Sequence, residues 1–443
     1  MATGADPDVL AARAAKLLAD NDLGCMTRAS SLLYPHMWSW DAAFIAIGLA
    51  SQSVPRAVME LDTLFSAQWA NGMIPHIVFA DGVEGYFPGP DRWACRELAA
   101  AAPTGRHTSG ITQPPVHAVA VQRILDRARA GSRSDRVVAE QFVDRRWPDL
   151  VRWHRWLAET RDPTECGRVT LYHGWESGMD NSPRWDSAYA NVTAGPMPAY
   201  QRSDNRIIDH RQRPSADEYE RYLWLVEEMK SVRYADDRLP QAMSFAVQDG
   251  FFTAVFAVAC EVLADIGDEL GRPAVDVRDL SSWADRFRAG LLGMTDQRTG
   301  AARDFDVRAG SWIITDTAAQ FAPLLCGGLP DARERTLLAL LDGPAFCGHP
   351  DLKFALPPST SPLSKDFRPR EYWRGPVWPV LNWLFFWALE RRGWPERAGI
   401  LRREGLRQVW EGTFAEYYEP FTGEPLGSPE QSWTAAVVLD WLA

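Results

Sequence analysis

The stretch Tyr34-Pro35-His36-Met37-Trp38-Ser39-Trp40-Asp41, followed by residues 42–50, joins two segments of different character. The first is polar and aromatic, and the second consists of apolar residues on every side. An apolar surface around a whole helix is typical of a helix buried in the core of a large protein. We therefore predict a loop that ends at Trp40-Asp41 and leads directly into a buried helix.

The same order of loop and apolar helix recurs five times along the chain. The loops end in Gln113-Pro114-Pro115, Gln248-Asp249-Gly250, Thr315-Asp316, Arg374-Gly375-Pro376 and Ser428-Pro429-Glu430. The buried helices that follow are expected over residues 116–130, 251–265, 317–325, 377–389 and 431–442. Amphipathic helices are expected over residues 54–71, 149–160, 217–232, 275–292, 331–341 and 395–410, and Asp6-Pro7 begins a first amphipathic helix that ends near residue 21.

This alternation predicts an all-α fold, the (α/α)6 toroid or six-hairpin barrel, with buried helices inside a ring of amphipathic ones. The N-termini of the inner helices would then surround one central site and offer free N–H groups to a ligand. Strand patterns are short, at residues 74–87, 168–173 and 310–314, and predict small inserted β-hairpins rather than a separate sheet domain.

Length and composition exclude several classes of protein. The chain has 443 residues, 46% of them hydrophobic, which is enough for a large core in one domain or two. Its net charge is −11 and it has no basic block, so a nucleic-acid or anionic-membrane surface is not expected. The six cysteines form no CxxC pair, and we predict reduced thiols, no metal site and no cofactor.

The start of the chain carries no targeting pattern. Residues 1–6 have no basic or apolar leader pattern, and no apolar run reaches the roughly 18 residues of a membrane span. We therefore expect a cytoplasmic protein.

Residues 173–186 hold three acids, Glu176, Asp180 and Asp186, among tryptophans, glycines and a proline. The segment has neither helical nor strand periodicity, so it predicts a loop that directs carboxyl groups between aromatic rings. Tryptophan faces stack on sugar rings, while acids bind hydroxyl groups or protonate a glycosidic oxygen. A sugar site is thus indicated, although an acidic surface loop is the alternative, and these residue types alone do not rank the three acids.

A second acidic and aromatic segment covers residues 414–423 and includes Glu416 and Glu419. Hydrolysis of a glycosidic bond ordinarily requires two carboxyl groups on opposite sides of the sugar, so this segment is a candidate for the second acid. An ordinary exit from a helix into a loop is the alternative for this pattern.

Four motifs together resemble glycoside hydrolase family 63, most closely its bacterial mannosylglycerate and glucosylglycerate hydrolases. They are Trp38-Ser39-Trp40-Asp41, the segment Gly174-Trp175-Glu176-Ser177-Gly178-Met179-Asp180-Asn181-Ser182, the segment Tyr372-Trp373-Arg374-Gly375-Pro376-Val377-Trp378, and residues 416–423. The resemblance implies a single (α/α)6 catalytic domain over residues 1–443, with inserted loops near 74–112 and 200–216 capping the site. It also implies inversion at the anomeric carbon and a homo-oligomer, dimer or tetramer.

The resemblance assigns roles to both acidic segments. It makes Asp180 the general acid and Glu416 the general base, with Glu419 supporting the base, and it makes Asp41 a ligand of sugar hydroxyl groups. In an inverting enzyme the two catalytic carboxyl groups are about 6.5–9.5 Å apart, which leaves room for water. The further candidates for substrate binding by motif are Trp38, Trp40, Trp175, Gly178, Tyr372, Trp373 and Trp378.

A glycerate aglycone would need cations or hydroxyl groups for its carboxylate. Residues 203–216 are polar and rich in arginine, and we propose Arg213 and Tyr219 as carboxylate ligands, supported by Tyr34, His76 and Gln113. The segment could close as a lid. Its alternative is an exposed arginine loop.

We expect an inverting α-glycosidase that hydrolyses 2-O-α-glucosylglycerate, and also mannosylglycerate, to the sugar and glycerate. The C2 epimers differ in one hydroxyl orientation, which the sequence does not resolve. The enzymatic alternative is an α-glucosidase or trehalase-like hydrolase of neutral α-glucosides, which predicts that the arginine-rich segment lies outside the site. The non-enzymatic alternative is a sugar-binding toroid.

Overall fold

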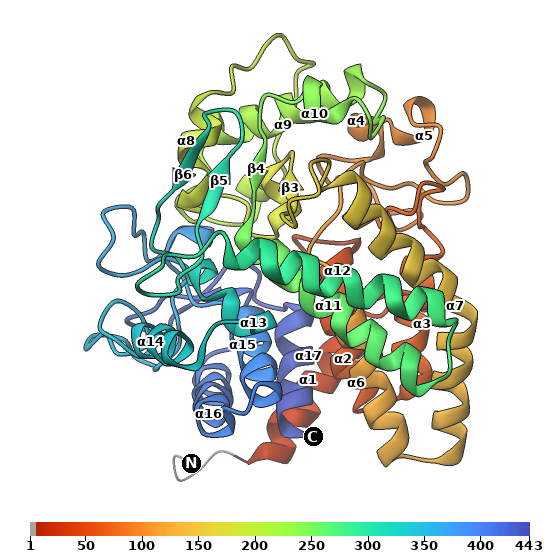
Figure 1. Ribbon diagram of the computed structural model, residues 1–443, viewed down its shortest axis with the longest axis vertical. Coiled ribbons are helices and arrows are strands. Elements are labelled where there is room, and N and C mark those ends of the chain that lie inside the picture. Colours follow the sequence, from red (N-terminus) through yellow and green to blue (C-terminus); the bar gives the residue numbers. More distant parts are fainter. Residues whose placement is uncertain (1–5) are drawn as a thin grey trace.

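The computed structural model describes residues 6–443, and residues 1–5, which contribute to the predictions on targeting and domain extent, lie outside it. A closed ring of inner helices forms the core (Figure 1). Its members contact one another in the order α2 (Ser39–Ala50), α6 (His117–Ala130), α11 (Gly250–Glu269), α13 (Pro323–Cys326), α15 (Pro379–Arg391) and α17 (Ser432–Leu442), and α17 returns to α2. The predicted buried helices therefore form the inner ring of an (α/α)6 toroid.

Outer helices cover this ring. They are α1 (Pro7–Asp20), α3 (Val54–Phe65), α7 (Arg133–Thr160), α12 (Ala274–Leu292), α14 (Asp331–Leu341) and α16 (Pro395–Glu411). Inner α2 is buried at every residue except Leu49, whereas α7 buries only part of its surface. Within residues 6–443, α11 alone is long and apolar enough to cross a membrane, and 89% of its apolar window is buried inside the ring. Burial rather than lipid contact accounts for its composition.

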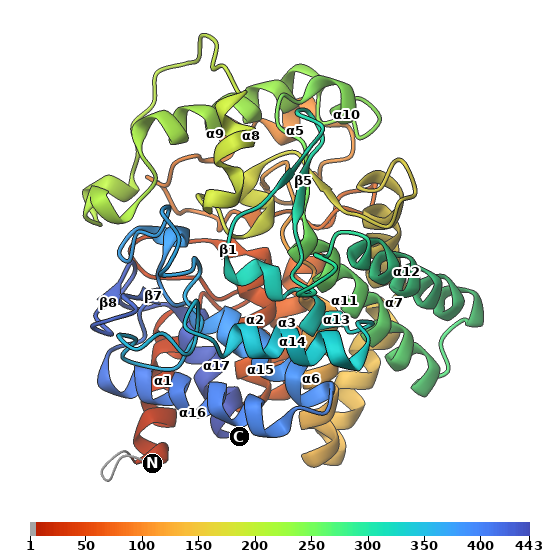
Figure 2. The ribbon, with the colours of Figure 1, turned by 60° about the vertical axis from the view of Figure 1, so that its left-hand side comes forward.

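Four predicted helices differ from the structure, and the simplest case is α3, which ends at Phe65 rather than near residue 71. Residues 217–232 were expected in the outer ring, but α9 (Ala216–Ser231) lies above one end of the toroid with α8 (Asp186–Ala190) and α10 (Leu239–Ala242), and α1 takes the outer place against α17 (Figures 1 and 2). The apolar face of α9 packs on the loops above the ring, so amphipathicity alone did not specify its partner.

Helix α7 starts at Arg133, not near residue 149, because Ser132 and Asp135 form a capping box that begins the helix there. The helix expected over residues 317–325 divides into the 3₁₀ turn η5 (Ala318–Phe321) and α13. Pro323 has no N–H to continue the first turn, which accounts for the break.

The strands are short and lie at the end of the ring where the inner helices begin. β1 (Met37–Trp38) pairs with β2 (Ile77–Val78), and β7 (Tyr417–Tyr418) pairs with β8 (Pro425–Leu426). β3 (Thr170–Leu171), β4 (Val247–Gln248), β5 (Asp304–Asp306) and β6 (Ser311–Ile313) form one antiparallel sheet in that order. Only β5 and β6 of this sheet form a local hairpin, and β3 and β4 join it from earlier parts of the chain.

The remaining short helices belong to the loops at this end. They are α4 (Pro90–Trp93), α5 (Cys95–Leu98), η1 (Gly174–Ser177), η2 (Pro183–Trp185), η3 (Asp204–Arg206), η4 (His210–Gln212) and η6 (Tyr372–Arg374). With the strands, they bring segments far apart in the chain around the N-termini of α2 and α17.

Candidate active site

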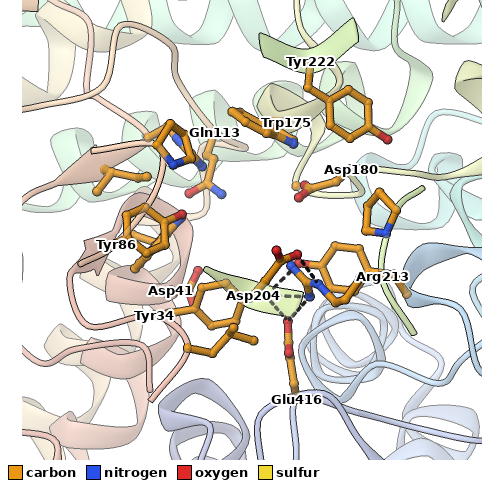
Figure 3. Close-up of a pocket in the computed structure, with 18 of the residues that line it drawn as sticks. Tyr34, Asp41, Tyr86, Gln113, Trp175, Asp180, Asp204, Arg213, Tyr222 and Glu416 are labelled. Carbon is orange, nitrogen blue, oxygen red and sulfur yellow. Dashed lines mark hydrogen bonds and ion pairs between the residues drawn. The ribbon is translucent and has the colours of Figure 1, made fainter. Parts of the chain in front are cut away.

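A pocket of about 830 Å³, counting its open mouth, lies at the end of the ring where the inner helices begin (Figure 3). Thirteen predicted site residues line it: Tyr34, Trp38, Trp40, Asp41, His76, Gln113, Trp175, Gly178, Asp180, Arg213, Tyr219, Tyr372 and Glu416. The other lining residues are Leu33, Ile77, Tyr86, Phe87, Pro88, Ser203, Asp204, Pro214, Tyr222, Gln431 and Trp433.

Glu416 stands just before β7 and is almost completely buried. Its backbone N–H donates to the carbonyl of Ser428, and its Oε2 accepts the N–H of Ser428 at 3.0 Å. Its Oε1 accepts the hydroxyl of Tyr34 at 2.9 Å and lies 3.9 Å from Nη1 of Arg213. Burial raises the pKa of Glu416, while Arg213 and these hydrogen bonds lower it.

Asp180 lies on the opposite side of the pocket from Glu416 (Figure 3). It follows η1 by way of Gly178, whose φ of +70° belongs to the left-handed region. A Cβ at Gly178 would lie 2.7 Å from the ring of Trp40, so glycine allows the loop to press against this ring. Burial raises the pKa of Asp180 to about 7, although Arg213 acts against the shift, and Glu416 adds to it.

Asp180 is the one acid of its loop that lines the pocket. Glu176 is fully buried and accepts two hydrogen bonds from Arg161, at 2.6 and 3.1 Å. Asp186 is half-exposed and pairs with Arg374 at 2.7 Å. These two ion pairs anchor the loop, so the structure separates three acids that residue types alone left equivalent.

Asp41 occupies the first turn of α2 and lies to one side of the two opposed acids (Figure 3). Gln431 donates to its Oδ1 at 3.4 Å from the start of α17. Burial is the main cause that raises the pKa of Asp41, and the charges of Glu416 and Asp180 raise it further. Four polar atoms in the pocket lining, His76 Nδ1, Gln431 Oε1, Trp433 Nε1 and Tyr222 Oη, are buried without a partner among the described residues. Such atoms are suited to ligand hydroxyl groups.

Three predicted substrate-binding residues are not part of the lining. Trp373 and Trp378 stack in parallel with ring centroids 3.7 Å apart, and Trp378 also stacks on Tyr417. Glu419 turns back on its own hairpin, where its Oε2 accepts the N–H and the hydroxyl of Thr422. The three-residue spacing from Glu416 does not place both acids on one helical face, because the segment is a β-hairpin.

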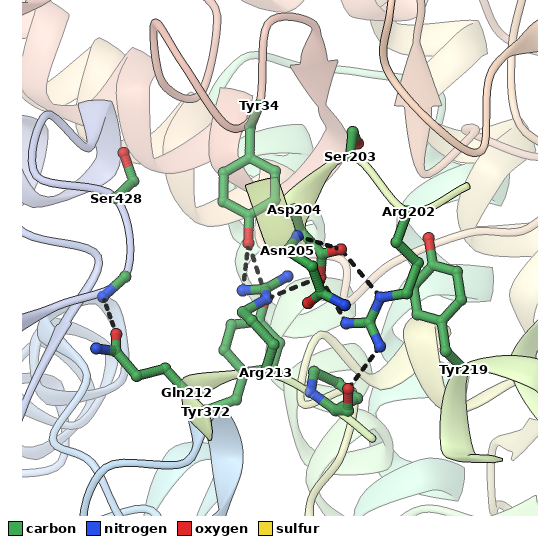
Figure 4. A network of polar contacts seen from close by, with 12 residues as sticks. Tyr34, Arg202, Ser203, Asp204, Asn205, Gln212, Arg213, Tyr219, Tyr372 and Ser428 are labelled. Atoms are coloured by element: carbon green, nitrogen blue, oxygen red, sulfur yellow. Dashed lines mark hydrogen bonds and ion pairs between the residues drawn. The ribbon is translucent and has the colours of Figure 1, made fainter. Parts of the chain in front are cut away.

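Residues 202–213, which we call the strap, cross the pocket mouth and bring Arg213 inside (Figure 4). Arg213 donates from Nε to Asp204 at 3.2 Å and from Nη1 to the Tyr34 hydroxyl at 2.8 Å. Its guanidinium also lies over the ring of Tyr372, 4.1 Å from the centroid. Arg202 holds the Asp204 carboxylate with two further bonds, at 2.7 and 3.0 Å.

The remaining predicted residues of the lining are Gln113, Tyr219 and His76. Gln113 accepts the backbone N–H of Trp40 with its Oε1, and the hydroxyl of Tyr219 donates to the carbonyl of Phe87. Burial lowers the pKa of His76 to about 3, so this side chain is neutral. Across residues 6–443, no cluster of three or more His, Cys, Asp or Glu side chains is arranged to hold a metal ion.

Sequence reasoning missed five residues with chemistry in the pocket: Tyr86, Asp204, Tyr222, Gln431 and Trp433. Gln431 and Trp433 stand at the start of α17, the place equivalent to Trp40-Asp41 in α2, so the recurring loop-helix pattern could have identified them. Tyr86 and Asp204 lie within the loops expected to cap the site. Tyr222 carries the weakest signal, because a tyrosine on an amphipathic helix is usually part of the core.

A ring of paired helices with two carboxyl groups facing each other across an aromatic pocket is the arrangement of a toroidal glycoside hydrolase. The family model for the mannosylglycerate hydrolase MGH1-like glycoside hydrolase domain matches residues 34–434. The chain is 73% identical over 437 residues to glucosylglycerate hydrolase from Mycolicibacterium hassiacum, covering 98% of each protein.

Among solved structures, it is similar to the GH63 mannosylglycerate hydrolase from Thermus thermophilus in complex with Tris. The TM-score is 0.90 at 35% identity, with 98% of this chain and 100% of that chain covered. A second structure of that enzyme, with Tris and D-glycerate, matches with a TM-score of 0.89 at 35% identity and the same coverage. The chain belongs to the MGH1-like glycoside hydrolases of family 63.

Proposed function

We propose that this enzyme hydrolyses 2-O-α-glucosylglycerate to glucose and glycerate with inversion at the anomeric carbon, and that mannosylglycerate is a second substrate. The observation that carries the proposal is the pocket itself, in which Asp180 and Glu416 face each other and Arg213 reaches inside. The glucosyl preference is supported by the relative at 73% identity, and the family model and the solved neighbours carry the mannosylglycerate name.

Asp180 is the general acid. Burial raises its pKa to about 7, so a substantial fraction is protonated near neutral pH. It donates its proton to the glycosidic oxygen as the bond from this oxygen to the anomeric carbon breaks, and glycerate leaves with a free hydroxyl group. Asp180 is then a carboxylate, which solvent reprotonates before the next turnover.

Glu416 is the general base. It accepts a proton from a water molecule whose oxygen attacks the anomeric carbon from the face opposite the leaving group. The charge of Arg213 and the hydrogen bonds from Ser428 and Tyr34 favour the ionised form that this step requires. One water molecule is consumed, and its oxygen stays on the sugar.

The sugar lies against Asp41, Gln431 and Trp433. Their polar groups are buried at the base of the pocket, and two of the three have an unpartnered atom there. Sugar hydroxyl groups would satisfy these atoms, and Trp40 and Trp175 supply apolar walls.

The glycerate carboxylate binds Arg213, with Tyr219 and Gln113 beside it. Asp204 and Tyr34 hold Nε and Nη1 of Arg213, and the guanidinium is part of the pocket lining, where it can meet the substrate carboxylate. The alternative of a neutral α-glucoside predicted that the arginine-rich segment lies outside the pocket, whereas Arg213 lines it. The solved relative in complex with D-glycerate supports this class of aglycone.

We further propose that the enzyme works in the cytoplasm as a homo-oligomer, a dimer or tetramer. All six cysteines are free thiols, and four of them are buried, as a reducing compartment favours. Light scattering of the purified protein measures the assembly.

Two amide variants and a substrate panel test the proposal. Asp180→Asn and Glu416→Gln should each abolish turnover, while calorimetry still detects binding of glucosylglycerate. Glucosylglycerate should be hydrolysed faster than mannosylglycerate, trehalose or an aryl α-glucoside. Retained turnover in both amide variants would refute the assignment of the general acid and general base. Faster hydrolysis of trehalose or the aryl glucoside would refute glucosylglycerate as the preferred substrate.

A further inference from the structure

The strap contacts the hairpin that carries the general base in two places that the substrate does not need. The backbone carbonyl of Gln212 accepts the hydroxyl of Tyr417 at 3.1 Å. The side-chain Oε1 of Gln212 accepts the backbone N–H of Gly427 at 3.2 Å (Figure 4). Gln212 itself is absent from the pocket lining, so these contacts join the strap to the hairpin rather than to a ligand.

The Gly427 peptide lies directly against the base. Gly427 has a φ of +68°, and a Cβ there would lie 2.4 Å from Oε2 of Glu416. The next residue, Ser428, donates its N–H to the same Oε2 at 3.0 Å. The bond from Gln212 therefore fixes the residue immediately before the one that donates to Oε2 of the base.

The next residue of the strap acts on the other oxygen. Arg213 donates to the hydroxyl of Tyr34, which donates to Oε1 of Glu416 at 2.9 Å. Consecutive strap residues, Gln212 and Arg213, thus control the partners of the two carboxylate oxygens from opposite sides. Asp204 and Arg202 hold Arg213 in this position from within the strap.

We propose that Gln212 is a positioning residue for catalysis, which holds the N–H of Gly427 and thereby the turn that presents the Ser428 N–H, so that Glu416 is oriented and ionised when the strap is seated. The inference rests on the proposed role of Glu416 as general base. It links closure of the strap to completion of the base, so that water is activated only after the pocket mouth is covered.

Ionisation of Glu416 depends on every group that faces it. These groups are the guanidinium of Arg213, the hydroxyls of Tyr34, Tyr372 and Tyr417, and the carboxyls of Asp41 and Asp180. Gln212→Met keeps the length of the side chain, removes the acceptor for Gly427 and alters none of these groups. Without a fixed Ser428 donor the pKa of Glu416 rises, because a hydrogen bond to a carboxylate favours its charged form.

The experiment measures kcat and KM for glucosylglycerate across pH with Gln212→Met and Gln212→Leu, two side chains that lack an acceptor oxygen. We expect each to lower kcat about tenfold, the size expected for one lost hydrogen bond. The acid limb of the kcat profile should move to higher pH, while the alkaline limb, set by Asp180, stays in place. Gln201→Ala is the matched control, because Gln201 is an exposed glutamine of the adjoining segment whose side chain contacts only Arg206.

Values of kcat and an acid limb equal to those of Gln201→Ala in both test variants would overturn the inference. A rise in KM alone would also overturn it, since the strap would then serve binding only. The Glu416→Gln variant distinguishes failure of the positioning role of Gln212 from failure of the proposed role of Glu416 as general base. If that variant is inactive while Gln212→Met is normal, only the positioning role fails; if it is active, the base assignment itself fails.

Discussion

Arg213 makes a prediction that separates recognition of the glycerate carboxylate from catalysis. The guanidinium bonds to Asp204 and Tyr34, lies 3.9 Å from Glu416 and lines the pocket, and we assign the substrate carboxylate to it. Arg213→Ala removes the substrate contact and also the cation beside the base. The second loss slows hydrolysis of every glycoside, whereas the first affects only a substrate with a carboxylate.

The size of the specific loss follows from the type of bond. A hydrogen bond to a charged group contributes about 1.5–3 kcal/mol, which corresponds to a factor of about ten to one hundred and fifty in kcat/KM. We therefore expect the ratio of kcat/KM for glucosylglycerate to that for an aryl α-glucoside to fall by this factor in Arg213→Ala. The shared effect on Glu416 cancels in the ratio.

Steady-state kinetics with the two substrates at one pH measure the ratio. Arg206→Ala is the matched control, because Arg206 belongs to the same strap but is exposed and bonds only to Gln201. Its ratio should equal that of the unmodified enzyme. An equal loss for both substrates in Arg213→Ala would refute the assignment of the carboxylate to this arginine.

Three further substitutions test the site. Asp180→Asn should stabilise the protein, because burial raises the carboxyl pKa from 3.8 to about 7 and so disfavours the ionised form in the folded enzyme. The stability that the folded enzyme has in acid is therefore lost as pH rises through 7. Denaturation of the variant should show a gain of about 4 kcal/mol in the free energy of unfolding at pH 8 and a smaller gain at pH 5. Gly178→Ala, in contact with Trp40, should cost more stability and more kcat than Gly82→Ala, which has nearly the same φ and open space; equal effects would argue against close packing under Asp180. Tyr222→Phe should leave stability unchanged or raise it yet lower kcat/KM, because its buried hydroxyl has no described partner; unchanged kinetics would remove it from substrate binding.

The recurring loop and apolar helix were sufficient to predict the inner ring, because a helix that is apolar all around has no stable place except a core. The amphipathic helices were less informative. Helix α9 has the same kind of apolar face as the outer helices, yet it covers the loops above the ring. An apolar stripe predicts that one face of a helix is buried. It does not predict which element covers that face, because this depends on packing between distant parts of the chain.

For the candidate site, too, one part could be predicted from the sequence and another part required the structure. The motifs identified Asp41, Asp180 and Glu416 as candidate site residues, and the resemblance to family 63 assigned a role to each. Composition could not distinguish Glu176 from Asp180, since both stand among tryptophans. The difference is Arg161, fifteen residues earlier, which pairs with Glu176 and removes it from the pocket. Such a pairing is visible only in three dimensions.

The partners of the base were beyond sequence reasoning for a similar reason. Tyr34, Gln212 and Ser428 come from three distant segments, and each contributes one hydrogen bond near Glu416. None has a local pattern that indicates this role. Their convergence depends on closure of the ring, which places the α2 and α17 ends side by side under the strap.

The anomeric form of the first product tests the central claim most directly, because inversion requires the water activated by Glu416 to enter opposite the group protonated by Asp180. Proton NMR of glucosylglycerate hydrolysis, recorded before mutarotation mixes the anomers, distinguishes the two forms. The opposed carboxyl groups predict that β-glucose appears first. Initial release of α-glucose would mean retention of configuration and would contradict the assignment of Asp180 and Glu416 as an inverting acid and base.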